Sequence, residues 1–94
     1  MNKKELVSAI ADETSLSQKD VGLVLDSFIE QVQAAVAKGD SVKLVGFGTF
    51  ERRERKERTG RNPRTGEALK IPASKVPAFS AGQQFKEAVN AEND

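Results

Sequence analysis

The 94-residue sequence contains no cysteine, histidine, tryptophan or tyrosine. Without cysteine there can be no disulfide, and without cysteine or histidine the usual ligands of a structural zinc ion are missing. The same absences remove the commonest general base and the softest nucleophile found in enzymes. We therefore expect no catalytic activity, metal, cofactor or small-molecule substrate, and we interpret the acids of the predicted helices as solvated surface carboxylates.

Long apolar stretches are also missing. No apolar run approaches the roughly 20 residues that a membrane-spanning helix needs. The N-terminus carries charge at Lys3, Lys4 and Glu5, where a signal peptide would need an apolar block. Together with the lack of disulfide-forming residues, these features predict a cytoplasmic protein without a membrane partner.

The supply of core-forming residues is modest. Hydrophobic residues make up 37% of the chain, and five residues are phenylalanines. The charged segment at residues 51–70 cannot join a core, and a lone core of the remaining size supplies only about 3–5 kcal/mol. Association with a second copy is the remaining source of stability, so we expect a homodimer. We assign to its core Phe28, Phe47, Phe50 and Phe79.

Capping residues and helical periodicity predict two N-terminal helices. Asn2 and Glu5 have the spacing of a capping box, and the helix that they begin is expected to end near Glu13. Ser17 caps the second helix, and Gly39 ends it as a left-handed C-cap. Between them, apolar side chains recur at steps of three and four: Val21, Val24, Leu25, Phe28, Ile29, Val32 and Val36.

After Gly39 the pattern becomes that of strands. One strand is predicted at residues 41–45, followed by a turn at residues 46–48. A second strand starts at Thr49 and continues into the charged segment. The chain then returns through residues 67–73, which gives a long hairpin.

Prolines and a final capping signal define the rest of the chain. Pro72 and Pro77 are expected at an edge or a strand end, because neither can donate to a ladder. Ser80 and Gln83 have capping-box spacing, which predicts a short C-terminal helix. Residues 90–94 are expected to be frayed.

These elements predict an α+β fold with two N-terminal helices, a three-stranded antiparallel sheet, a protruding β-ribbon arm and a short C-terminal helix. We expect a single domain over residues 1–94. Its parts are a helical dimerisation base at residues 1–39, the sheet at residues 40–80 with the protruding arm at about residues 52–75, and the C-terminal helix and tail at residues 81–94.

The net charge of +1 conceals a strong segregation of charge. Residues 1–50 carry −2, residues 51–70 carry +4 and residues 71–94 carry −1. Positive charge is therefore concentrated on one segment, as in proteins that bind nucleic acid. Its basic residues are Arg52, Arg53, Arg55, Lys56, Arg58, Arg61, Arg64 and Lys70.

The centre of this segment predicts a hairpin with an apolar tip. Gly60 and Gly66 frame the turn, and no acid lies between Arg58 and Arg64. A two-stranded ribbon fits a groove of DNA, and arginine forks match phosphate oxygens. Pro63 at the midpoint presents a rigid apolar ring that can insert between base pairs. A mixed-sign charge run is usually a solvated surface, but the combination favours DNA.

A set of residues spread over the chain forms a longer signature. It consists of Gly46-Phe47-Gly48-Thr49-Phe50, Arg55, Arg58, Gly60, Arg61-Asn62-Pro63, Thr65, Val76-Pro77-Ala78-Phe79 and Phe85-Lys86-Glu87-Ala88-Val89. This signature closely resembles that of the bacterial histone-like HU family and its relative, integration host factor. The resemblance implies an intertwined dimer, with two arms that reach around double-stranded DNA and insert proline wedges from the minor groove.

The resemblance also implies the residues that contact DNA. Phosphate and groove contacts would come from Arg53, Arg55, Arg58, Arg61, Arg64, Lys70 and Lys75. Asn62 and Pro63 would form the tip, shaped by Thr65 and Gly66, with Pro63 as the intercalating residue. Lys3 and Lys86 would contact the DNA flanks. Gln83 and Gln84 stand where relatives often have a lysine, which implies a weaker flank grip.

The leading hypothesis is a non-enzymatic, nucleoid-associated architectural protein. It would bind and bend double-stranded DNA with little sequence preference, compact it, and prefer nicked, mismatched or already bent DNA. One alternative is an integration-host-factor-like subunit with real sequence preference. Another is a protein- or membrane-interaction module, which the lack of apolar periodicity in the arm disfavours.

Overall fold

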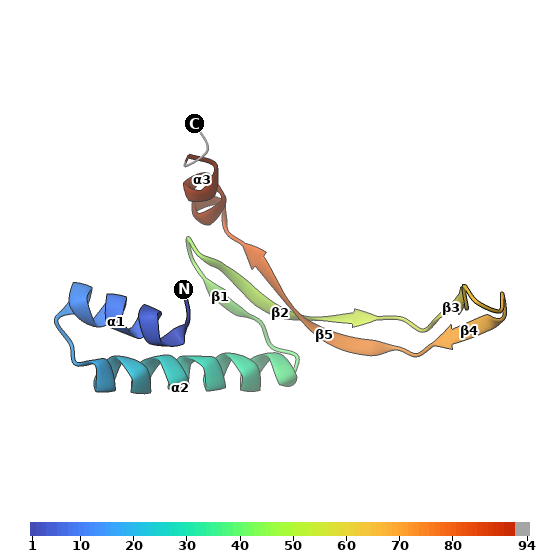
Figure 1. Ribbon diagram of the computed structural model, residues 1–94, viewed down its shortest axis with the longest axis horizontal. Coiled ribbons are helices and arrows are strands. Elements are labelled where there is room, and N and C mark those ends of the chain that lie inside the picture. The colour runs from blue at the N-terminus through green and yellow to red at the C-terminus, as the bar shows by residue number, and fades with distance from the viewer. Residues whose placement is uncertain (92–94) are drawn as a thin grey trace. The chain divides into compact units, whose positions relative to one another are not determined.

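The computed structural model describes residues 1–91, which form two compact units: residues 1–34, and a second unit that begins at Ala35. The boundary between the units lies inside the second helix. In chain order the elements are α1 (Lys3–Thr14), α2 (Gln18–Ala37), β1 (Val42–Leu44), β2 (Gly48–Arg55), β3 (Arg58–Arg61), β4 (Ala68–Ile71), β5 (Ser74–Ala81) and α3 (Gln83–Ala91) (Figure 1).

Side-chain caps begin both N-terminal helices. The Asn2 side chain accepts a hydrogen bond from the Glu5 amide at 2.8 Å. Ser17 caps α2 in the same way, since its Oγ accepts from the Asp20 amide at 3.0 Å. Both predicted helix starts are confirmed, because a cap depends only on residues close in sequence. The first helix runs one residue past its predicted end, to Thr14.

The second unit contains a three-stranded antiparallel sheet with the strand order β1-β2-β5. A turn at residues 45–47 joins β1 to β2, and β5 pairs with β2 along its whole length. Gly48 is required by close packing. A Cβ at this position would overlap the Phe79 ring and the Ser80 carbonyl.

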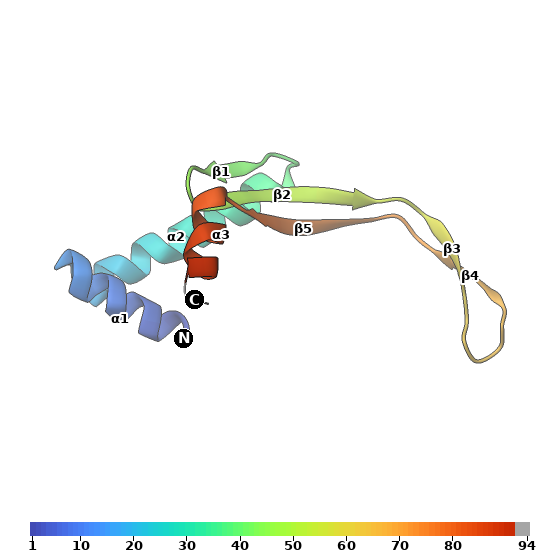
Figure 2. The same cartoon turned by 90° about the horizontal axis from the view of Figure 1, so that it is seen from above.

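Beyond the sheet, β3 and β4 form a second antiparallel ladder that continues β2 and β5. We call this ribbon, with its tip, the arm (residues 52–75). Two residues in each strand separate the pair Arg55↔Ser74 from the pair Arg58↔Ile71, so the register is the same on both sides of the interruption. The ribbon bends there without a bulge (Figure 2).

The two prolines of the return strand explain the interruption. Pro77 lies within β5, an edge strand, and Pro72 lies between β4 and β5, as predicted. Successive N–H groups of an antiparallel strand point alternately toward and away from the partner. Positions 72 and 77 are an odd number of residues apart, so only one proline can occupy an outward-pointing site. The ladder continues past Pro77 and stops at Pro72, which identifies Pro72 as the proline that breaks it.

The start of α3 corrects one prediction. Ser80 does not cap this helix, because it lies within β5 opposite Thr49. Gly82 begins the helix instead: its carbonyl accepts from the Lys86 amide at 3.1 Å, and its amide donates to the Phe47 carbonyl at 2.8 Å. The predicted frayed tail lies partly outside the described residues, at 92–94.

An aromatic cluster joins the sheet to α3. Its members are Phe47, Phe50, Phe79 and Phe85, and the ring centroids of neighbouring members are 4.9 to 6.3 Å apart. Phe47 and Phe79 nevertheless remain 44% and 40% exposed in a single chain. Three of the predicted core phenylalanines are therefore together, on a surface that one chain does not cover.

Few side chains are buried. Within residues 1–91, the buried apolar residues are Ala11, Val21 and Val36, and no large side chain is completely enclosed. In the same range, no helix has the length and apolar character that would allow it to cross a membrane. The predicted α+β fold, with its sheet, arm and three helices, is confirmed.

Candidate nucleic-acid interface

Strand alternation gives β2 an apolar face and a polar face. Side chains at even positions share the face of Phe50, and those at odd positions share the opposite face. The polar face carries Arg53 and Arg55. Arg53 Nη2 donates to Glu51 Oε1 and to Ser80 Oγ, each at 3.1 Å. The sheet therefore holds Arg53 at the root of the arm, with its charge partly neutralised.

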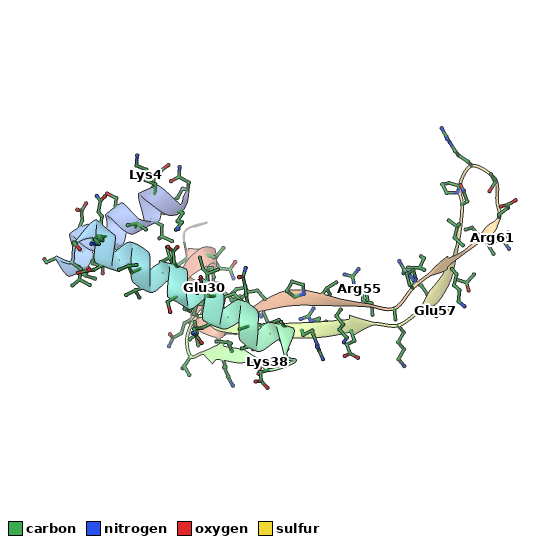
Figure 3. The ribbon with its side chains drawn as sticks, turned by 90° about the horizontal axis from the view of Figure 1, so that it is seen from below. Lys4, Glu30, Lys38, Arg55, Glu57 and Arg61 are labelled. Carbon is green, nitrogen blue, oxygen red and sulfur yellow. The ribbon has the colours of Figure 1, made fainter. Side chains whose placement is uncertain are left out.

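Further along the arm, cationic side chains are free. Arg55, Arg58, Arg64 and Lys75 are exposed, and their side chains form no ion pair or hydrogen bond within the described chain. Figure 3 shows Arg55 midway along the ribbon and Arg61 near its tip. Arginines along an extended ribbon can follow a phosphate backbone, since each guanidinium can bind two oxygens.

Acids of the arm pair with some of its basic residues. Glu57 Oε1 lies 3.1 Å from Lys70 Nζ, and Glu54 Oε1 lies 3.3 Å from Arg52 Nη2. Lys70 remains 78% exposed. An exposed pair such as that of Lys70 with Glu57 contributes only about 0–1 kcal/mol, so a phosphate can replace the Glu57 carboxylate at little cost.

The tip is a turn closed by its own hydrogen bonds. The Asn62 amide donates to the Glu67 carbonyl at 2.9 Å, and the Asn62 carbonyl accepts from the Gly66 amide at 2.8 Å. Asn62 Oδ1 also accepts from the Arg64 amide at 2.9 Å. Pro63 lies inside this closed turn with its side chain exposed. The proline ring is therefore presented outward from a loop that is ordered without a ligand.

Two more predicted contact residues stabilise the tip. Thr65 Oγ1 accepts from the Glu67 amide at 3.3 Å. Arg61 Nη1 donates to the Gly66 carbonyl at 3.4 Å, which leaves its other N–H groups for a partner. Gly66 has a φ of 73°, which glycine adopts without steric cost.

The two predicted flank residues lie outside the arm. Lys3 belongs to the first unit, where its ammonium pairs with the Asp26 carboxylate. Lys86 is exposed on α3 in the second unit. The structure therefore groups the predicted arm residues on one ribbon, whereas Lys3 and Lys86 come from separate elements.

One functional candidate was missing from the sequence-based set. Arg52 lies on the same face of β2 as Phe50, and its side chain is 25% exposed, compared with 59% for Arg53. Its Nη1 donates to the Ala37 carbonyl at 3.3 Å. Counting alternate positions from Phe50 would have assigned Arg52 to the apolar face.

Over residues 1–91, no three acids gather closely enough to hold a metal ion. What the second unit offers is a cationic two-stranded ribbon with an exposed proline at its tip. This arrangement is that of proteins that bind DNA through a β-ribbon.

Comparison with known proteins identifies the family. A family model described as bacterial DNA-binding protein matches residues 1–90. The chain belongs to this family of bacterial, histone-like DNA-binding proteins, which includes HU, and the resemblance noted in the sequence is confirmed.

Individual relatives match over nearly the full chain. DNA-binding protein HU from Clostridium pasteurianum is 54% identical over 90 residues, which cover 96% of this chain and 99% of the relative. DNA-binding protein HU from Nostoc sp. is 55% identical over 89 residues, covering 95% of each chain. The Anabaena HU–DNA cocrystal structure is 55% identical, with a TM-score of 0.86 over 95% of this chain and 97% of that chain.

Proposed function

We propose that this protein binds double-stranded DNA as a homodimer and bends it, without catalysing a reaction. Two arms, one from each copy, grip the duplex, and the Pro63 rings insert between base pairs from the minor groove. The protein then acts as an architectural component of the cytoplasmic nucleoid that wraps and compacts DNA. It prefers nicked, mismatched or already bent DNA, because part of the bending cost is then removed.

The observation that carries this proposal is the exposed Pro63 in a closed turn at the end of a cationic ribbon. Because hydrogen bonds within the turn hold its backbone, the ring needs no rearrangement before it meets DNA. Unstacking a base step costs a few kcal/mol, which the additional contacts of a bent duplex offset.

Free arginines along the ribbon support binding with little sequence preference. Arg55, Arg58 and Arg64 can reach phosphate oxygens, and phosphate contacts carry no direct sequence information. A solved HU–DNA complex is 55% identical to this chain, which supports DNA as the ligand.

The incomplete core supports a dimer. Phe47 and Phe79 keep 44% and 40% of their surface exposed in one chain, and a second copy that covers them would also supply the second arm. An integration-host-factor-like subunit with sequence preference is the alternative. Competition between random and defined duplexes distinguishes the two, since only the alternative predicts a strong advantage for one sequence.

The variant Pro63→Ala tests the wedge. We expect it to lose most DNA bending and to keep much of its affinity, because the phosphate-binding arginines are unchanged. Bending is measured by energy transfer between dyes at the two ends of a nicked duplex, and affinity by titration in the same buffer.

Pro77→Ala is the matched control, since Pro77 lies in the edge strand β5 and not at the tip. It should bend DNA like the unaltered protein. If Pro63→Ala bent DNA as strongly as the unaltered protein does, intercalation would be refuted, and the arm would act through its charge alone.

A further inference from the structure

The last turn of α2 leaves one carbonyl group for a side chain to satisfy. Gly39, with a φ of 95°, ends the helix. The Asp40 amide donates to the Ala35 carbonyl, and the Gly39 amide to the Val36 carbonyl, both at 3.0 Å. This pair of bonds is the Schellman motif, which satisfies the carbonyls of the third-last and second-last helical residues. The carbonyl of Ala37, the last helical residue, receives no backbone donor in the described chain.

Arg52 satisfies this carbonyl from β2. Its Nη1 donates to Ala37 O at 3.3 Å, while its Nη2 bonds to Glu54 Oε1 at 3.3 Å. The last turn of α2 has no basic residue of its own. The guanidinium therefore adds to the positive charge of Lys38, the residue after the helix, at an end that favours positive charge.

The guanidinium lies close over the backbone at position 39. A Cβ on Gly39 would lie 3.0 Å from Arg52 Nη2 and 3.3 Å from its Cζ, so the guanidinium would have to shift by a few tenths of an ångström. Glycine at this position thus allows the left-handed backbone conformation and also leaves space for the guanidinium. Two features converge on one contact: the carbonyl of Ala37 that receives no backbone donor, and the space above Gly39.

We propose that Arg52 is a positioning residue of the arm and not a ligand of DNA phosphate. It attaches the root of β2 to the end of α2, and so fixes the direction in which the opposite face of the strand, with Arg53 and Arg55, points. The inference rests on the proposed DNA-bending function, because it assigns a role within the same arm. The proposal divides the basic residues of the arm into those that bind DNA and Arg52, which orients the strand that carries them.

Arg52→Met tests the assignment, with Arg55→Met as the matched control. Both replacements remove one guanidinium and keep a long unbranched side chain. Affinity for a nicked duplex is measured over a range of salt concentrations, and the spread of bend angles by single-molecule energy transfer. We expect Arg52→Met to keep the slope of log K against log salt and to broaden the bend-angle distribution. Arg55→Met should make this negative slope shallower, by about 0.9 for each phosphate that the protein no longer neutralises.

Two results would overturn the assignment. If the negative slope became as shallow in Arg52→Met as in Arg55→Met, Arg52 would be a phosphate ligand. An unchanged slope and bend distribution, with only a lower melting temperature, would make it a stabilising residue alone. A flat salt response or an unbent duplex with the unaltered protein would instead refute the proposed function itself.

Arg52→Lys keeps the test decisive if Arg52→Met does not fold. Lysine retains the charge but loses the planar fork that bonds to Ala37 and Glu54 together. A positioning role predicts a bend distribution that is broader than in the unaltered protein, whereas a phosphate ligand predicts an unchanged one.

Discussion

At the scale of single residues, Asn62 shows how the tip is ordered. Its backbone amide, its carbonyl and its Oδ1 all bond within the turn, to Glu67, Gly66 and Arg64. Only the side-chain amide group remains available to a base edge. We therefore infer that Asn62 mainly holds Pro63 in place.

The variant Asn62→Ala should reduce bending while most of the affinity remains. The Arg64 amide loses its acceptor, and a hydrogen bond of this kind contributes about 1 kcal/mol. Bending is measured by energy transfer, and the order of the tip by the chemical shift of the Arg64 amide.

Asn62→Asp is the companion variant, because it keeps the acceptor oxygen. Its added negative charge should weaken binding, yet the DNA that it binds should be bent normally. If Asn62→Ala bent DNA fully but changed the preference for DNA sequence, Asn62 would instead be a residue that contacts bases.

Residue-level prediction succeeded where the interaction is local and failed where it is not. Asn2, Ser17 and Gly39 were assigned correctly, because a cap needs only its own turn. Ser80 has the same type of spacing, but pairing with β2 keeps it in a strand, where its hydroxyl meets Arg53 and Glu51. No pattern within a few residues of Ser80 reports the partner strand.

At the scale of elements, the arm consists of two ladders separated by a break in hydrogen bonding. The hairpin and the position of its tip were predicted from the composition of residues 51–70. The break was not, because it depends on the spacing of Pro72 and Pro77 relative to a partner strand. The ion pair of Glu57, within the break, with Lys70, in β4, links the two strands at the outer side of the break.

The variant Pro72→Ala should extend the inner ladder into the break. It supplies an N–H that points toward the partner strand, so we expect slower amide hydrogen exchange at residues 56–58 and 71–73. Pro77→Ala should leave exchange there unchanged, since its new N–H points away from β2. Unchanged exchange in Pro72→Ala would mean that the break has another cause.

At the scale of the whole molecule, one chain leaves its aromatic cluster partly uncovered. Composition predicted this shortage of core, since the arm contributes charge and no burial. Composition could not predict which partner each basic residue contacts. Arg52 contacts a helix end, Arg53 and Lys70 contact acids, and Arg55 and Arg58 remain free. That division arises from strand faces and register, which a count of charges does not contain.

If a second copy covers the cluster, the melting temperature must rise with protein concentration, because association stabilises only the folded state. Native mass should be twice the 10.2 kDa of one chain. Phe79→Ala should lower the melting temperature and favour dissociation, with a cost of about 3–5 kcal/mol if the ring is buried in the dimer.

Leu69→Ala is the control for this variant. Leu69 is 46% exposed in one chain, similar to the 40% of Phe79, but it lies on the arm. Its truncation should leave the dimer intact. A melting temperature that is independent of concentration would show that the chain is stable alone.

The break also changes which side chains share a face of the arm. In the inner ladder the hydrogen-bonded pairs fall at odd positions of the outgoing strand, since the Gly82 amide bonds to the Phe47 carbonyl. In the outer ladder they fall at even positions, since the Asn62 amide bonds to the Glu67 carbonyl. Such pairs recur every two residues in an uninterrupted antiparallel ladder. The break therefore shifts the alternation by one residue, so a face assignment that is counted along β2 does not extend to the outer half of the arm.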